Sequence, residues 1–141
     1  MIVVGVDGSV GSRGALAWAL AEAELRGCTV EVVSAWTSDE RQVRERQRHV
    51  VDGVRRETET AVATSCEVVH GDAVDVLVRS SAKADLLVVG SHDVSGLRHA
   101  GQESVSAACA RLAECPCVVV PARQSPSRHI GNEVVQVPST P

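Results

Sequence analysis

Short aliphatic runs alternate with longer segments of helical spacing along most of this 141-residue chain. The runs are Ile2–Val6, Thr29–Trp36, Cys66–His70, Asp85–Gly90 and Cys117–Val120. Because most of their positions are apolar and many are β-branched, the runs favour buried strands. The segments between them are expected to form helices over about 12–26, 38–64, 73–84 and 101–113. This alternation predicts an α/β fold, in which a mainly parallel sheet carries helices on both faces.

The segment 38–64 is the most strongly charged of the expected helices. Its apolar residues form one narrow stripe, which consists of Val43, Val50, Val54 and Ala61. Its arginines are interspersed with acidic residues, which favours a solvated, salt-bridged face over an anion-binding patch. Most of this helix is therefore expected to face water.

The length and composition fit one folded domain. Hydrophobic residues make up 44% and charged residues 23% of the chain, close to the average of globular proteins. After Arg123 the composition changes to proline, serine, glutamine and threonine, including Pro126, Pro138 and Pro141. We therefore expect a folded domain over 1–123 and a flexible tail over 124–141.

Several classes of function conflict with this composition. Phe and Tyr are absent and the formal net charge is −4, so the chain lacks both the stacking surfaces and the basic excess of a nucleic-acid binder. No apolar segment approaches the ~18 residues of a membrane-spanning helix, and no secretion signal is visible. Together with an odd set of five cysteines, this predicts a reduced, cytoplasmic protein without nucleic-acid or membrane partners.

The usual signatures of catalysis are also missing from the sequence. There is no Ser/His/Asp nucleophile elbow, no phosphate-loop lysine and no metalloprotease helix motif. Cys115 and Cys117 enclose Pro116, a spacing that indicates a turn rather than a redox pair. We therefore expect no enzymatic activity.

The expected topology indicates where a ligand would bind. Open parallel sheets hold ligands beyond the carboxyl ends of their strands, at the point where the strand order reverses. The loops after Val6, Trp36 and Gly90 are therefore the candidate site.

Two well-separated segments resemble the universal stress protein family. The first is VGVDGS at Val4–Ser9, followed by ALAWA at 15–19 and VVSAW at Val32–Trp36. The second, Ala84–Pro121, resembles that family's fourth strand, glycine loop, last helix and final strand. The resemblance covers about residues 1–123. It implies a Rossmann-like sheet of the adenine nucleotide alpha hydrolase type, with strand order 3-2-1-4-5, and a dimeric sensor or regulatory module of the stress response.

The resemblance also implies a site for the adenosine part of a nucleotide. Asp7 matches the acidic residue beside the adenosine, Ala35 matches the position whose backbone faces adenine, and Val89 would line the pocket. A carboxylate there can accept a hydrogen bond from a ribose hydroxyl. A plain turn at Asp-Gly-Ser explains the same aspartate equally well.

The phosphate loop of nucleotide-binding members has the pattern Gly, two residues, Gly, nine residues, Gly, and then Ser or Thr. Gly90 and Ser104 match its first and last positions, but Asp93 and Glu103 stand where the second and third glycines belong. Glycines let backbone amides approach phosphate oxygens. Each carboxylate instead opposes a triphosphate, at about one to three decades of affinity. We therefore expect adenosine contacts to survive better than triphosphate contacts, and ATP to bind weakly or not at all.

Two alternatives to a purely regulatory module stay open. One is weak ATP binding through Asp7, Gly90 and Ser104. The other is a divalent-metal module, in which His99 and Glu103 share a helical face, with His92 and Asp93 as further ligands. That arrangement requires the last helix to begin before His99.

The last expected strand favours self-association. Val118, Val119 and Val120 form a flat apolar run without a charged residue, and free edges of that kind invite pairing. Together with the resemblance, this predicts a homodimer through these residues. Pro121 would limit the pairing because it lacks an amide hydrogen.

Overall fold

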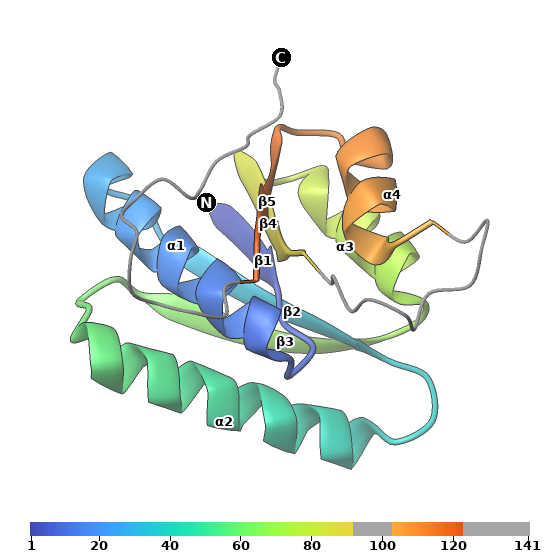
Figure 1. The fold of residues 1–141 in the computed structure, drawn as a ribbon, viewed down its shortest axis with the longest axis horizontal. Coiled ribbons are helices and arrows are strands. Elements are labelled where there is room, and N and C mark those ends of the chain that lie inside the picture. Colours follow the sequence, from blue (N-terminus) through green and yellow to red (C-terminus); the bar gives the residue numbers. More distant parts are fainter. Residues whose placement is uncertain (92–102, 123–141) are drawn as a thin grey trace.

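A computed structural model describes residues 1–91 and 103–122, along which strands and helices alternate as the sequence predicts (Figure 1). The strands are β1 (Ile2–Gly5), β2 (Val30–Trp36), β3 (Thr64–His70), β4 (Leu86–Gly90) and β5 (Cys117–Val120). The helices are α1 (Val10–Arg26), α2 (Glu40–Thr58), α3 (Ala73–Ser81) and α4 (Val105–Leu112). The expected tail, 124–141, lies outside the described residues, so its flexibility stays a prediction.

All four strand pairings are parallel, and the order across the sheet is β3-β2-β1-β4-β5. β1 lies at the centre, where Ile2 is paired with Val30 of β2 and with Leu86 of β4. The chain extends the sheet from β1 to β3 in one direction and then from β4 to β5 in the other. This confirms the predicted fold and places the reversal of strand order at the carboxyl ends of β1 and β4, which we call the switch point.

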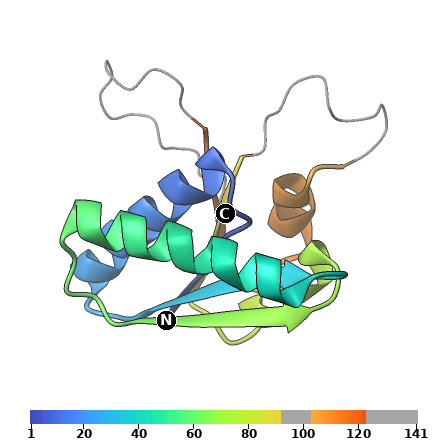
Figure 2. The ribbon, with the colours of Figure 1, turned by 90° about the horizontal axis from the view of Figure 1, so that it is seen from below.

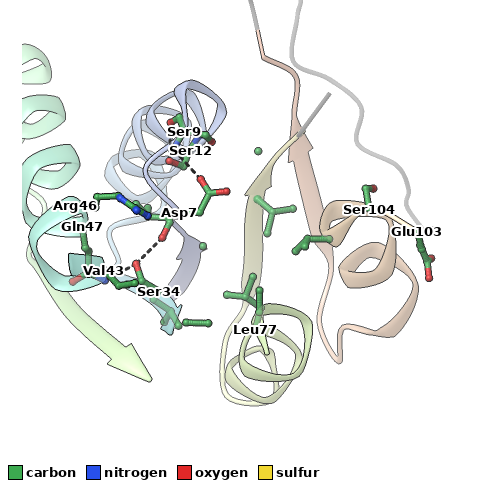
Figure 3. A pocket seen from close by; sticks show the side chains of 18 residues that line it. Asp7, Ser9, Ser12, Ser34, Val43, Arg46, Gln47, Leu77, Glu103 and Ser104 are labelled. Carbon is green, nitrogen blue, oxygen red and sulfur yellow. Dashed lines mark hydrogen bonds between the residues drawn. The ribbon is translucent and has the colours of Figure 1, made fainter. Parts of the chain in front are cut away.

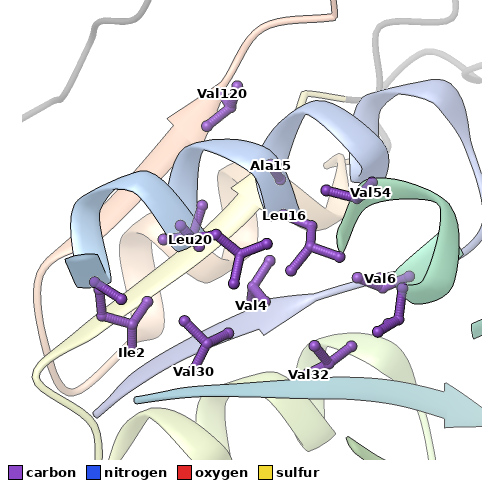
Figure 4. Packing of buried hydrophobic residues seen from close by; sticks show 14 of the residues in the cluster. Ile2, Val4, Val6, Ala15, Leu16, Leu20, Val30, Val32, Val54 and Val120 are labelled. Atoms are coloured by element: carbon purple, nitrogen blue, oxygen red, sulfur yellow. The ribbon is translucent and has the colours of Figure 1, made fainter. Parts of the chain in front are cut away.

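Helices cover both faces of the sheet (Figures 1 and 2). α1 and α2 enclose alternate residues of β1, such as Ile2 and Val4, whereas α3 and α4 cover the opposite face around Val3. Figure 4 shows Leu16 and Leu20 of α1 packed over the strands of the first face. Because Phe and Tyr are absent, aliphatic side chains fill both layers, and each strand of the sheet centre is buried on both sides.

The structure corrects the extent of the second helix. α2 ends at Thr58 rather than near residue 64, because Glu59 adopts a left-handed conformation (φ 51°) and its amide donates to the carbonyl of Arg55 at 2.9 Å. Ala61 is therefore exposed beyond the helix instead of lying on its apolar stripe. The buried face consists of Gln47, Val50, Val51 and Val54. Neither α2 nor any other helix in the described part of the chain is long and apolar enough to cross a membrane.

The last helix is also shorter than expected. α4 begins at Val105 rather than near Gly101, because Ser104 has extended backbone and its Oγ accepts a hydrogen bond from the amide of Ala107 at 3.1 Å. This is the geometry of a helix N-cap. Glu103 therefore precedes the helix.

The backbone is unusually close-packed at the switch point. A Cβ atom added to Gly90 would lie 2.5 Å from the carbonyl oxygen of Gly11 in the first turn of α1. A Cβ at Gly11 would in turn lie 3.0 Å from the carbonyl oxygen of Ser91. Gly90 is therefore required for packing, independently of any contact with a ligand.

This contact predicts that Gly90→Ala destabilises the domain by about 1–3 kcal/mol, because two backbone segments must separate to admit the methyl group. Gly14→Ala is the matched control, since the nearest atom to its added Cβ is the Cγ1 of Val120 at 4.0 Å. Within helix α1 the control should stabilise the domain by about 0.5–1 kcal/mol. Urea unfolding measures both changes, and equal stability of the two variants would contradict the packing argument.

Candidate functional site

A cavity of about 480 Å³ opens at the switch point. Its walls are the carboxyl ends of β1, β2 and β4, the β1–α1 loop, one side of α2, and parts of α3 and α4. The predicted site residues that line it are Asp7, Ala35, Val89, Gly90, Glu103 and Ser104. Asp93 lies outside the described residues. The structure therefore brings the described candidates around one cavity, and their contacts with a ligand stay a prediction.

The β1–α1 loop forms the floor of the cavity beside α1. Oδ1 of Asp7 accepts a hydrogen bond from the amide of Ser9 at 2.9 Å, so this aspartate shapes the turn as its simpler interpretation predicts. Gly8 has a positive φ of 92°, which favours glycine at that position. Ser9 then caps α1 by accepting a hydrogen bond from the amide of Ser12 at 3.3 Å. Because Ser9 and Ser12 both line the cavity, the amino-terminal end of α1 lies there.

A buried polar chain that sequence reasoning missed holds α2 against the sheet. Gln47 is only 4% exposed, and its Nε2 donates to Oγ of Ser34 at 3.0 Å and to the carbonyl of Glu67 at 2.9 Å. The hydroxyl of Ser34 donates to the carbonyl of Val6 at 2.6 Å (Figure 3). Both side chains line the cavity. A sequence signal for this buried role exists, because Gln47 lies at helical spacing from Val43 and Val50, within the apolar stripe.

Arg46, the residue before this glutamine, also lines the cavity. Its aliphatic stem lies over the β1–α1 loop, since a Cβ at Gly8 would be 2.9 Å from its Cδ. Figure 3 shows the side chain extending from α2 toward Asp7. Arg46 is exposed, and its guanidinium places a cation at the cavity.

The start of α4 forms the opposite wall. Ser104 uses its hydroxyl as the helix cap and lies 3.3 Å from the hydroxyl of Ser106. Glu103 forms a two-pronged ion pair with Arg111, at 2.6 Å for Oε1 to Nη2 and 3.1 Å for Oε2 to Nε. These hydrogen bonds lower the pKa of Glu103 and raise that of Arg111. Figure 3 shows the carboxylate on the outer side of α4, directed away from Asp7 and Ser34.

The described residues do not place Glu103 on the helix that the metal hypothesis requires. Glu103 precedes α4, so it cannot share a face of that helix with His99. Within residues 1–91 and 103–122 no group of three or more His, Cys, Asp or Glu side chains is arranged to hold a metal ion. His92, Asp93 and His99 lie outside those ranges.

The thiols of the cysteines near α4 have raised pKa values. Burial raises the pKa of Cys109 to about 11 and that of Cys117 to about 12, so both stay protonated at neutral pH. The thiol of Cys115 donates weakly to the carbonyl of Pro116 at 3.4 Å. Because the thiolate is the reactive form of cysteine, this environment fits the predicted turn better than a redox pair.

The cavity offers hydrogen-bond acceptors, two helix N-termini and a cation around an apolar surface. That combination suits a ligand with an apolar ring and an anionic group. The fold defines a Rossmann-like α/β domain with a cavity at its switch point. The sequence model of the universal stress protein family matches residues 1–121, and the chain belongs to this family.

Curated relatives come from mycobacteria. Universal stress protein Rv2005c of Mycobacterium tuberculosis (strain ATCC 25618 / H37Rv) is 36% identical over 138 residues, which cover 88% of this chain and 45% of the relative. Universal stress protein Rv1996 of the same strain is 29% identical over 157 residues, which cover 90% of this chain and 50% of the relative. The chain thus spans about half the length of these relatives.

Solved structures agree with the fold over nearly their whole length. A universal stress protein in complex with cAMP has a TM-score of 0.75 and 28% identity, covering 86% of this chain and 96% of that protein. The universal stress protein from Archaeoglobus fulgidus in complex with dAMP has a TM-score of 0.65 and 25% identity, covering 84% and 94%.

The polar chain of α2 yields a prediction about stability. Gln47→Met keeps the side-chain volume but removes both hydrogen bonds that the buried Nε2 of Gln47 donates, to Ser34 and to the carbonyl of Glu67. We expect a loss of about 1–3 kcal/mol in the free energy of unfolding. Arg48→Met, an exposed neighbour on the same helix, should change it by less than about 0.5 kcal/mol. Chemical denaturation compares the two, and a loss no larger than the control would refute the role of Gln47.

Proposed function

We propose that this universal stress protein domain is a regulatory module that binds an adenine nucleotide with a single phosphate at the switch point, and that it has no enzymatic activity. The observation that carries the proposal is the convergence of Asp7, Ala35 and the N-termini of α1 and α4 on one cavity. All five cysteines are free, which supports the accompanying proposal of a reducing, cytoplasmic setting.

Each part of an adenine nucleotide has a counterpart in the walls of the cavity. Val33, Ala35 and Val89 offer a small apolar surface for the base. The carboxylate of Asp7 is an acceptor for a ribose hydroxyl. The helix N-termini and Arg46 favour the negative charge of a phosphate.

A single phosphate is favoured over three for two reasons. Asp93 and Glu103 replace two of the glycines whose amides hold the phosphates in the family pattern. In addition, the two related structures of at least 25% identity described above hold cAMP and dAMP, each with one phosphate. We therefore expect AMP and cAMP to bind more tightly than ATP.

Calorimetric titration of the purified chain tests this preference. AMP or cAMP should bind more tightly than ATP, and GMP serves as the comparison for the base. Asp7→Asn keeps an oxygen acceptor for the amide of Ser9 but loses the charged partner of the ribose, which should weaken AMP binding about tenfold.

The control is Asp52→Asn, which removes the same charge from an exposed position on α2 and should leave AMP affinity unchanged. Submicromolar binding of ATP would contradict the preference for one phosphate. Absence of binding for all four nucleotides would refute the proposed function itself.

We further propose that the domain forms a homodimer through β5. This strand is at the edge of the sheet and pairs only with β4 among the described strands. Val119 on it is only partly buried, whereas Val118 and Val120 pack into the core. An apolar edge of this kind favours pairing with a second copy, as the family resemblance implies.

Val119→Lys should shift the chain from dimer to monomer, because it places a charge at the shared edge. Sedimentation velocity gives the species, and circular dichroism verifies that the helix content is retained. Leu25→Lys is the control: Leu25 is 83% exposed and belongs to α1 rather than to the proposed shared strand, so this variant should stay dimeric. A parent chain that sediments as a monomer at micromolar concentration would overturn the proposed dimer.

A further inference from the structure

The ion pair between Glu103 and Arg111 spans the length of α4. Glu103 lies before the N-cap of the helix, and Arg111 lies in its last turn. Ion pairs along a helix usually join residues three or four positions apart. Here the partners are eight positions apart, and the guanidinium meets both carboxylate oxygens. A bidentate pair of this kind fixes the direction of a carboxylate as well as its charge.

That direction matters because of what the start of α4 offers. The Ser104 hydroxyl caps the amide of Ala107, and the helical pattern leaves the amides of Ser104, Val105 and Ser106 without an intrahelical acceptor. Ser104 and Val105 line the cavity. A carboxylate turned inward would compete with a phosphate for these donors and for the positive end of the helix dipole.

Glu103 is therefore the residue whose placement decides how anions meet this helix. It lines the cavity and stands where the family pattern has glycine. Its carboxylate nonetheless lies on the outer side of α4 (Figure 3), beside the cation of Arg111. The outward direction of the carboxylate reduces its repulsion of a ligand phosphate. The neighbouring charge of Arg111 reduces that repulsion further, because the ion pair as a unit is close to neutral.

We propose that Arg111 is a positioning residue for ligand binding, which holds the carboxylate of Glu103 outward and so keeps the start of α4 accessible to the phosphate of a bound nucleotide. This inference rests on the proposed function. Arg111 itself makes no contact with the ligand in this arrangement, since it lies in the last turn of α4 and is absent from the cavity lining.

A double-mutant cycle tests the inference. Dissociation constants for AMP and for adenosine are measured on the full chain for the parent, Arg111→Met, Glu103→Gln and the double variant. Arg111→Met should weaken AMP binding about tenfold and adenosine binding less than about twofold, because only AMP carries a phosphate. Glu103→Gln in the parent should change AMP affinity less than about twofold, because that carboxylate already points away.

The decisive measurement is the coupling between the two positions. In the double variant Glu103→Gln should restore AMP affinity to within about twofold of the parent, although the same change does little on its own. If the two side chains acted only through their net charge, Glu103→Gln would raise AMP affinity by the same factor in both backgrounds. That result would overturn the positioning role.

Two controls separate the remaining outcomes. Arg26→Met breaks a comparable surface pair with Glu22, at 2.8 Å near the end of α1, and should leave AMP binding unchanged. If Arg111→Met weakens AMP and adenosine equally, its effect is on the structure of the wall, and the inference fails. If the parent binds AMP and adenosine but Arg111→Met binds both as the parent does, the inference alone fails. If the parent binds neither, the proposed function fails and the inference fails with it.

Discussion

The direct backbone contact between Gly90 and Gly11 is the constraint on which the cavity depends. The strand order reverses between β1 and β4, so the loops that follow these two strands lead to opposite sides of the sheet. The chain between β1 and α1 must therefore turn at the carboxyl ends of the strands. Without side chains at the two glycines, β4 reaches the first turn of α1, and the start of this helix lies beside the strand ends. The N-terminus of α1 therefore lies at the site because of how the fold packs at these two glycines.

A second tie positions the wall that faces this contact. α2 packs on the sheet through valines, which resist sliding only weakly because apolar contact is not directional. The hydrogen bonds from Gln47 to Ser34 and to the carbonyl of Glu67 are directional, and they join α2 to two strands at once. Because Ser34 in turn donates to the carbonyl of Val6, the α2 wall is linked to the β1–α1 loop that carries Asp7.

Sequence reasoning succeeded where one residue type has one structural meaning. Buried aliphatic runs separated by helical segments specify a parallel sheet, and the topology then locates the end of the sheet at which the cavity opens. It failed where tertiary context decides. Glu59 ends α2 in a left-handed conformation, which a sequence indicates only when glycine or asparagine stands at that position. The apolar pattern of the last helix begins earlier in the sequence, but the cap at Ser104 sets the observed start of α4. Gln47 was not predicted to be buried because it is a polar residue within an otherwise apolar stripe.

The phosphate side of the site shows why counting charges along a motif is insufficient. The motif gives Glu103 a position in the chain, and from that position alone the carboxylate falls among the ligand's phosphates. The interaction energy between the carboxylate and a phosphate depends on their distance and on the neighbouring charges. Different rotamers of a glutamate move its carboxylate by several ångströms. Arg111 lies eight residues further on, outside the motif, yet it determines which choice is taken. A departure from the family pattern at one residue is therefore interpretable only together with the residue that pairs with it.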